Sequence, residues 1–351
     1  MQKRIVTFGE VLLRWSKNGR RRLSQGSQFN GNYGGSEANV AVSLATMGDQ
    51  VEYVTRLPNN IIGRACRDEL RYYGLDLNHI AWGGERLGTY YFEEAAAMRN
   101  SSVVYDRNNS AFNSMAPGMI NWQNVFKGAD IFHCSGITCA VSQSAADATF
   151  EAVQAAKDMN LTICCDINYR KNLWKYGADS RETLCRLMQF SDFIFGDQGE
   201  WEQVTGMPQI PLTTSTDEKE VDFTPHIEYV KRIHEMFPNC KRFIYGMRNQ
   251  ITSTHHTLTG ILYCEGKIIT THIYDILNIV DPMGVGDAFV AGFVHASLRW
   301  PDDNQRCLDF ALAAATMKNS IQGDFNLNTE EEILALDARK RGIEPETFYE
   351  T

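Results

Sequence analysis

Hydrophobic and polar residues follow two different rhythms along this chain of 351 residues. Short runs of β-branched and aromatic residues indicate strands, and stretches with apolar residues at three- and four-residue spacing indicate amphipathic helices. The predicted strands are RIVTFGEVLL (4–13), QVEYVTRL (50–57), ADIFHCSGI (129–137), LTICCDINY (161–169), DFIFGD (192–197) and CKRFIYGM (240–247). The predicted helices are SEANVAVSLATMG (36–48), GRACRDELRYYG (63–74), QSAADATFEAVQAAKDMN (143–160) and SRETLCRLMQF (180–190).

This alternation of strands and helices predicts an α/β fold with a mostly parallel central sheet between two layers of helices. Ligands of such a sheet bind at the carboxyl ends of its strands. Two segments interrupt the alternation. Residues 88–97 and 101–112 read as a hairpin, so we expect a small β-lid formed from about 12–33 and 86–112. Residues 207–225, rich in Pro, Thr and acid, predict an inserted surface loop without chemistry. No internal repeat or compositional boundary divides the chain, and residues 1–351 are predicted to form a single domain.

Composition narrows the possible partners. A formal net charge of −9 and a pI of about 5.4 argue against a nucleic acid or an anionic membrane as partner. The one basic cluster, at 17–22, is interpreted as a solvated loop. No apolar run has the length of a membrane span, and the N-terminal segment reads as a strand rather than a signal peptide. The nine cysteines form no CxxC pair, which favours free thiols in a reducing cytoplasm.

The candidate chemistry lies in IVDPMGVGDAFVAGF, residues 279–293. Two glycines, Gly284 and Gly286, stand where a helix is about to begin, and they allow a tight turn and a close approach of a ligand to the backbone. The free amides of the first helical turn make an anion site. Asp287 beside a bound phosphate is suited to take a proton from an attacking hydroxyl, which implies phosphoryl transfer to an alcohol. The alternative is that Asp287 only stabilises the helix dipole.

Two motifs in this chain resemble the signatures of the ribokinase-like (PfkB) sugar kinases. DPMGVGDAF matches the second signature, and GGSEANVAVSLATMG, followed by Gly63, matches the first. The similarity spans about residues 4–324. It implies the three-layer αβα fold of that family, with a β-lid over the sugar. It also implies Asp287 as base, an anion hole made by the amides of Gly284, Val285 and Gly286, and ATP as phosphoryl donor.

The nucleotide side of the site follows from the same resemblance. GDQGEW (196–201) is similar to the Asn-x-x-Glu element of the family, with Asp197 in place of Asn and with Glu200 retained. This implies that Glu200 holds Mg²⁺ indirectly, through water, which suits the oxygen ligands and waters that Mg²⁺ prefers. The alternative is a helix N-cap followed by a first-turn acid, and both can hold at once. The Lys-x-Gly-x-x-Gly loop of the family is missing from 244–260, where Arg248 is the candidate for positive charge. The resemblance also implies that Asp281 is one of the residues that bind the nucleotide.

Within the family, the segments 10–48, 133–138 and 166–174 are similar to 2-keto-3-deoxygluconate kinases. The implied substrate-binding residues are Gly34, Gly35, Asn39, Tyr90, Tyr105, Arg107, Arg170 and Asp324. A planar guanidinium can hold the carboxylate of a sugar acid with two parallel hydrogen bonds, so Arg107 and Arg170 fit an anionic substrate. The expected reaction is ATP-dependent phosphorylation of 2-keto-3-deoxygluconate to its 6-phosphate.

Two alternatives remain open at this point. One is a kinase for a neutral ketose such as fructose, in which both arginines form ordinary salt bridges. The other is a catalytically silent sugar-binding protein of the same fold. The resemblance also suggests a homodimer formed through the lid. His133 is interpreted as a hydrogen-bonded structural residue, and the spacing of His255 and His256 predicts no zinc site.

Overall fold

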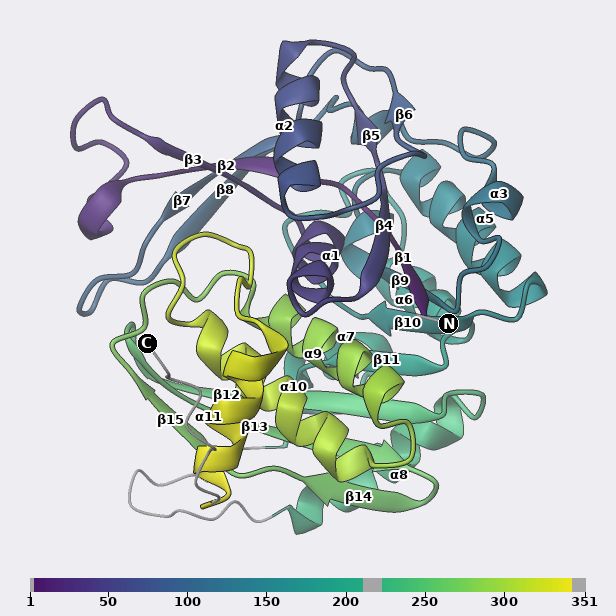
Figure 1. Cartoon of the computed structure of the whole chain (residues 1–351), viewed down its shortest axis with the longest axis vertical. Coiled ribbons are helices and arrows are strands. Elements are labelled where there is room, and N and C mark those ends of the chain that lie inside the picture. Colours follow the sequence, from purple (N-terminus) through teal and green to yellow (C-terminus); the bar gives the residue numbers. More distant parts are fainter. Residues whose placement is uncertain (1–2, 211–222, 343–351) are drawn as a thin grey trace.

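The computed structural model describes residues 3–210 and 223–342. In this part of the chain, nine strands form one large sheet (Figure 1). Six of them are parallel and lie in the order β4 (Gln50–Val54), β1 (Arg4–Phe8), β9 (Ile131–Ser135), β10 (Thr162–Asp166), β11 (Phe193–Gly196) and β12 (Arg242–Thr252). The sheet continues antiparallel through β13 (His255–Cys264), which pairs with β14 (Lys267–Thr270) and β15 (Tyr274–Leu277).

Helices cover both faces of this sheet, as the alternating pattern predicts. Successive strand residues point to opposite faces, so Ile5 packs in one core and Val6 in the other. The first face is covered by α1 (Ser36–Thr46), α2 (Ile61–Tyr72), α9 (Val285–Arg299), α10 (Asn304–Lys318) and α11 (Glu330–Lys340). The second is covered by α3 (Trp122–Val125), α4 (Gly136–Cys139), α5 (Gln143–Asp158), α6 (Ser180–Met188), α7 (Gln198–Thr205) and α8 (Thr224–Met236).

A four-stranded sheet projects from this layered body (Figure 1). It consists of β3 (Asn30–Gly34), β2 (Leu12–Ser16), β7 (Thr89–Glu93) and β8 (Ser102–Asp106), in that order. The hairpin predicted from residues 88–112 is confirmed, because β7 and β8 pair antiparallel. A short parallel pair, β5 (Arg56–Leu57) and β6 (Ala81–Trp82), lies apart from both sheets.

The predicted strand at 4–13 is two strands. β1 belongs to the central sheet and β2 to the projecting one, and the chain passes between them at Gly9. A Cβ atom at Gly9 would lie 2.0 Å from Oε2 of Glu37, so this crossing requires glycine. The predicted helix at 63–74 begins earlier, at Ile61, because the side chain of Asn60 accepts hydrogen bonds from the amides of Ile62 and Gly63.

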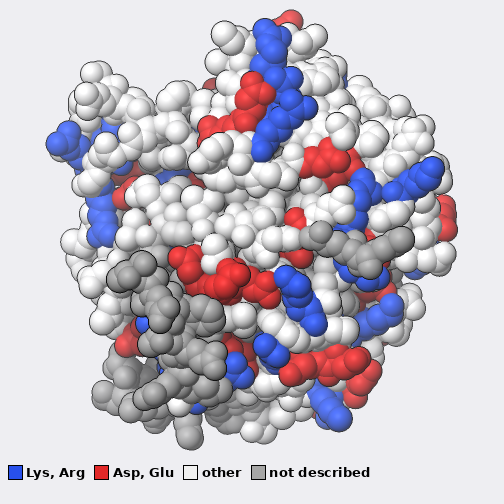
Figure 2. Space-filling view, in the orientation of Figure 1, with Lys and Arg blue, Asp and Glu red and all other residues white. Residues whose placement is uncertain are grey.

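The predicted insertion at 207–225 falls largely on residues 211–222, which lie outside the described residues. No helix within residues 3–210 and 223–342 combines the length and apolarity of a membrane span. On the face shown in Figure 2, basic and acidic side chains are interspersed.

Candidate functional site

A cavity of about 920 Å³ lies at the carboxyl ends of the parallel strands. Residues that follow these strands line it, as the rule for parallel sheets predicts. The N-terminus of α9 and side chains of β7 and β8 complete the wall. The predicted residues in this lining are Gly35, Asn39, Tyr90, Tyr105, Arg107, Arg170, Asp197, Glu200, Arg248, Gly284, Val285, Gly286, Asp287 and Asp324.

The turn that starts α9 requires glycine at its first position. Gly284 is the N-cap residue and has φ 77°, in the left-handed region. A Cβ atom there would lie 1.9 Å from the main-chain oxygen of Asp324. A residue with a side chain therefore cannot occupy position 284 unless the main chain at Asp324 moves. The first turn of α9 lines the cavity, so its free amides are in the position that the predicted anion site requires.

Asp287 is held by residues of the first signature. Its Oδ1 accepts a hydrogen bond of 3.1 Å from Ser36 Oγ, and its Oδ2 accepts one of 2.7 Å from Asn39 Nδ2. Oδ1 of Asn39 in turn accepts a hydrogen bond of 3.2 Å from the amide of Gly35. Burial raises the pKa of Asp287, and the two hydrogen bonds and Arg170 act against this shift. Two signatures about 250 residues apart in the chain thus meet around one carboxylate.

Two further acids line the cavity that the sequence did not single out. Glu37 is 1% exposed, and its Oε1 accepts hydrogen bonds of 2.6 Å from both Ser135 Oγ and Thr138 Oγ1. Burial raises the pKa of Glu37 to about 7. Asp166 ends β10, and burial raises its pKa well above the usual value, with Glu200 and Asp287 adding to the shift. A polar residue at the end of a predicted buried strand was the available signal for Asp166.

Asp197 and Glu200 form a capping box at the start of α7. Asp197 Oδ1 accepts a hydrogen bond of 2.9 Å from the amide of Glu200, and Glu200 Oε2 accepts one of 2.9 Å from the amide of Asp197. The helix-cap interpretation is therefore confirmed, while both residues also line the cavity. Burial raises the pKa of Glu200 to about 7, with the charge of Asp197 adding to the shift.

Arg107 is a buried residue of the cavity lining, and only part of its guanidinium group is engaged in an ion pair. Its Nε donates a hydrogen bond of 2.8 Å to Glu10 Oε2, and Nη2 contacts the same oxygen. Ser110 Oγ donates to the other oxygen of Glu10 at 2.5 Å. Nη1 of Arg107 is buried and has no hydrogen-bond partner within the described part of the chain. Arg107 thus lines the cavity and retains one donor that Glu10 does not engage.

The other two arginines predicted at the site are more accessible. The Arg170 side chain is 45% exposed, and its Nη1 lies 3.4 Å from Glu200 Oε1 and 2.9 Å from the main-chain oxygen of Tyr169. Arg248, on β12, is exposed. Tyr90 and Tyr105 lie on adjacent strands with ring centroids 5.9 Å apart, and Arg107 Cζ lies 5.6 Å from the centroid of the Tyr105 ring.

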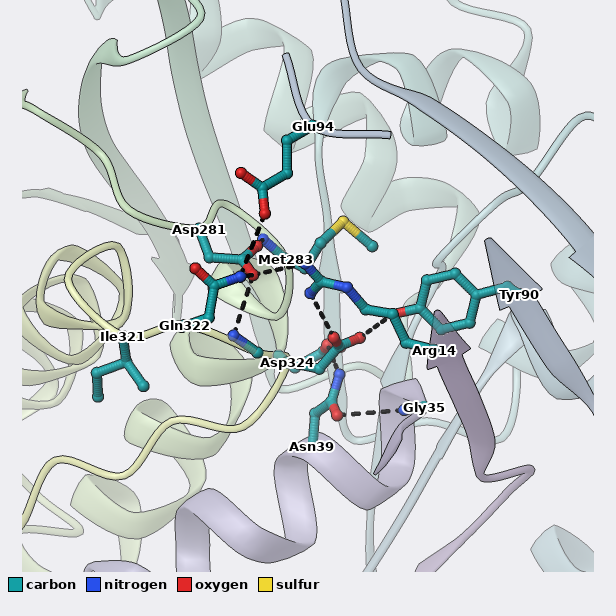
Figure 3. Close-up of polar contacts among 12 residues, drawn as sticks. Arg14, Gly35, Asn39, Tyr90, Glu94, Asp281, Met283, Ile321, Gln322 and Asp324 are labelled. Carbon is teal, nitrogen blue, oxygen red and sulfur yellow. Dashed lines mark hydrogen bonds and ion pairs between the residues drawn. The ribbon is translucent and has the colours of Figure 1, made fainter. Parts of the chain in front are cut away.

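Two predicted residues do not line the cavity. Asp281 is fully buried, and its carboxylate is occupied by an ion pair of 2.7 Å with Arg14 and by the amides of Met283 and Gly323 at 3.0 Å (Figure 3). The prediction that Asp281 contacts the nucleotide is not supported by this position. Gly34 packs behind Asp324, where a Cβ atom would lie 2.4 Å from Oδ2. The sequence also gave no reason to select Arg14, whose two partners lie more than 260 residues away.

The histidines make no metal centre in residues 3–210 and 223–342, where no group of three or more His, Cys, Asp or Glu side chains is placed to bind a metal ion. His133 is buried in β9, and burial lowers its pKa to about 3, so it is a neutral structural residue outside the cavity lining.

Comparison with known proteins gives a consistent result. The family model of the pfkB family carbohydrate kinases matches residues 2–240. The chain is 27% identical to 2-dehydro-3-deoxygalactonokinase of Haloferax volcanii, covering 95% of this chain and 96% of the relative. It is 27% identical to 2-dehydro-3-deoxygluconokinase of Bacillus subtilis, covering 84% and 82%. The crystal structure of 2-dehydro-3-deoxygluconokinase from Thermotoga maritima superposes with a TM-score of 0.88 at 32% identity, covering 96% of this chain and 99% of that one.

The family model covers more than half of the chain, and the three-layer fold and both signatures agree with it. The chain belongs to the pfkB family of carbohydrate kinases.

Proposed function

We propose that this protein transfers the γ-phosphoryl group of ATP to a hydroxyl of a sugar acid, with 2-keto-3-deoxygluconate as substrate and its 6-phosphate as product. The observation that carries the proposal is that one cavity is lined both by Asp287, at the N-terminus of α9, and by Arg107, whose Nη1 has no partner among the described residues. The first feature suits phosphoryl transfer and the second suits an anionic acceptor. The relatives named above act on sugar acids of this class.

In this proposal Asp287 is the base. Its carboxylate takes the proton of the acceptor hydroxyl as that oxygen bonds to the γ-phosphorus, and the bond from phosphorus to the bridging oxygen of ADP breaks. Ser36 and Asn39 orient the carboxylate, since each donates to one of its oxygens. The amides of Gly284, Val285 and Gly286 stabilise the charge on the transferred group.

The carboxylate of the sugar acid is assigned to Arg107 and Arg170. Arg107 is already neutralised by Glu10, so it contributes a directed donor more than a net charge. Arg170 supplies the more accessible guanidinium. Tyr90 and Tyr105 provide flat surfaces beside the sugar, and Asp324, which accepts a hydrogen bond from the Tyr90 hydroxyl, also lines the cavity.

The phosphates of ATP are assigned to the end of the cavity near Glu200, Asp197 and Arg248. The donor set fits Mg²⁺, which binds proteins through one or two carboxylates while keeping waters and phosphate oxygens as its other ligands. Glu200 would hold the ion through water, because Oε2 is engaged by the amide of Asp197. When bound, the ion neutralises charge on the phosphates.

The same proposal includes a homodimer formed through the four-stranded sheet, which acts as a lid over the sugar. The side of this sheet that bears Tyr91 and Phe29 carries apolar surface, with Val104 56% and Phe29 40% exposed. A second copy of the sheet is the expected partner for this surface.

An ADP-release assay with ATP and Mg²⁺ tests the function. The acceptors are 2-keto-3-deoxygluconate, 2-keto-3-deoxygalactonate, fructose and ribose. We expect kcat/KM for the two keto-deoxy acids to exceed that for the neutral sugars by about 100-fold, the value of one or two charged hydrogen bonds. Arg170→Met should reduce this preference. Equal turnover of all four sugars would contradict the assignment of the carboxylate to the arginines.

One observation favours a second candidate, a kinase for a neutral ketose. Glu10 already neutralises the charge of Arg107. A sugar without a carboxylate would therefore add no further negative charge beside this pair. Turnover restricted to fructose or ribose would select this alternative and would leave the role of Asp287 unchanged. Absence of turnover together with absence of nucleotide binding in calorimetry would select a silent sugar-binding protein.

A further inference from the structure

Arg14 is a buried cation that the proposed reaction does not use. It lies on β2 of the four-stranded sheet and is 0% exposed. Its Nη2 donates to Asp281 Oδ2 at 2.7 Å and its Nη1 to Asp324 Oδ1 at 2.8 Å (Figure 3). Its Cζ lies 4.5 Å from the centroid of the Phe92 ring, also on this sheet. One guanidinium from the projecting sheet therefore joins two acids of the main body.

The two acids belong to the turns that set the N-terminus of α9. Asp281 lies in the turn before that helix, and it accepts the amides of Met283 and Gly323. Asp324 lies in the turn after α10, and its main-chain oxygen is the atom that would meet a Cβ at Gly284. The turns at 281–284 and 322–325 thus pack as one unit, and its position determines where the amides of Gly284 to Gly286 point.

Other contacts from the projecting sheet reach the same unit. The Tyr90 hydroxyl, on β7, donates to Asp324 Oδ2. Gln322 Nε2 donates to Asp281 Oδ2 at 3.0 Å and to Glu94 Oε1 at 3.3 Å, and Glu94 directly follows β7 (Figure 3). Of the described residues of the sheet that make these contacts with the two turns, Arg14 is the only cation. It alone bridges both acids with charged hydrogen bonds, which are stronger than neutral ones.

A lysine cannot reproduce this bridge. A guanidinium presents several donors in a fixed plane, whereas an ammonium is a point charge on a flexible stem. Lys318, a second buried cation near Asp281, already donates to the main-chain oxygens of Ile321 at 3.0 Å and Asp281 at 3.4 Å. It binds the backbone of the two turns and leaves their carboxylates to Arg14.

We propose that Arg14 is a positioning residue through which the four-stranded sheet fixes Asp324 and the anion-binding turn at 281–286 relative to the sugar. This inference rests on the proposed function for its catalytic consequence, but the positioning itself is a property of the fold. Movement of the sheet on sugar binding would be transmitted by Arg14 to the turn that receives the phosphoryl group.

Kinetics of Arg14→Lys, Asp281→Asn and the double variant test the proposal. We expect each single variant to raise the KM for the sugar and lower kcat by about tenfold, because small misplacements of reacting groups are costly. The nucleotide affinity measured by calorimetry should stay within about threefold of wild type, with one binding site per chain. This result would show that the variants are folded, so that partial unfolding does not cause the change in KM and kcat. The double variant should resemble the single ones, since both remove the same bridge.

Arg4→Lys is the matched control. Arg4 forms an ion pair with the buried Glu52 between β1 and β4, and neither residue lines the cavity. This variant should lower stability without changing the KM for the sugar. An unchanged KM in Arg14→Lys, or effects of Arg14→Lys and Asp281→Asn that add fully, would overturn the proposal. If Arg14→Lys does not fold, Asp281→Asn alone tests the proposal. Arg14 keeps its ion pair with Asp324 in that variant, so its charge is not left without a partner.

Hydrogen exchange separates this inference from the proposed function. Arg14→Lys should increase amide exchange at 281–288 and 321–325 at least tenfold, while the strands β4, β1 and β9 exchange as in wild type. This result would support the positioning role even for a wild-type protein without phosphotransfer to the sugars tested. Unchanged exchange at both turns would overturn it, whatever the activity.

Discussion

At the scale of single residues, the chemistry of the site depends on how burial and hydrogen bonds act on a few carboxylates. Asp287, Glu37 and Glu200 all face the cavity, and burial raises the pKa of each. Only Asp287 combines this environment with the N-terminus of α9. Its position inside the second signature made it predictable from sequence. Glu37 was not predictable as a buried acid, because its partners Ser135 and Thr138 come from a distant strand end and helix.

Replacing Asp287 by Asn should lower kcat by about 10²- to 10⁴-fold, the usual contribution of a general base. The side chain keeps its size and can still accept from Ser36, so nucleotide affinity should remain unchanged. The ADP-release assay measures the rate, and thermal unfolding shows that the variant is folded. In wild type, kcat should fall on the acid side at a pH above the ordinary Asp value of about 3.9, because the pKa of Asp287 is raised and only its ionised form accepts the proton. A variant with near-normal turnover would exclude Asp287 as base.

Glu37 predicts a pH dependence of stability. Its folded-state pKa of about 7 lies above the ordinary value of 4.5, so the folded state binds the proton more tightly than the unfolded state. The stabilising contribution is therefore complete below about pH 4.5 and is lost as pH rises through 7. Glu37→Gln carries no ionisable group there. Relative to wild type it should gain about 2 kcal/mol of unfolding free energy between pH 5 and pH 8, measured by urea denaturation. A constant difference between the two proteins would show that Glu37 has an ordinary pKa in the folded state.

At the scale of elements, the site is made where helices and strands begin or end. The patterns at 36–48 and 279–293 predicted α1 and α9, and the capping box at Asp197 and Glu200 could be read directly from its spacing. Local sequence determines such features. The division of residues 4–13 into β1 and β2 was missed, because the two strands pair with different strands, β4 and β3, that come later in the chain. For the same reason the bridge made by Arg14 could not be predicted.

The turn before α9 allows a matched pair of substitutions. Gly284→Ala places a Cβ against the oxygen of Asp324 and in the left-handed region, whereas nothing lies within 4 Å of a Cβ at Gly286. We expect Gly284→Ala to lower kcat at least tenfold and stability by about 1–3 kcal/mol, and Gly286→Ala to be close to wild type in stability. Thermal unfolding and the ADP-release assay on both variants check this. Equal stability of the two variants would contradict the geometry described for Gly284.

At the scale of the whole molecule, the proposed dimer makes a further prediction. Val104→Asp adds a charge on the edge strand β8, within the exposed apolar side of the four-stranded sheet. A dimer formed through this surface should dissociate, because an unpaired charge in a dry interface is costly. Light scattering at micromolar concentration measures the mass. Tyr72→Asp, at an 84% exposed position on α2 and outside the four-stranded sheet, is the control and should leave the mass unchanged. A monomeric wild-type protein would contradict the dimer itself.

The pairing of Asp287 with Asn39 also has a consequence for synthesis. The ribosome releases α1 and the strands β1, β9, β10 and β11 long before α9 and α10. Until residues 285–318 emerge, the apolar residues on one face of these strands have no helix α9 or α10 to cover them. Such an incomplete nascent chain exposes hydrophobic surface and is prone to aggregate. Because α9 brings both Asp287, the proposed base, and part of the missing cover, the chain gains this residue in the same late step that covers its core.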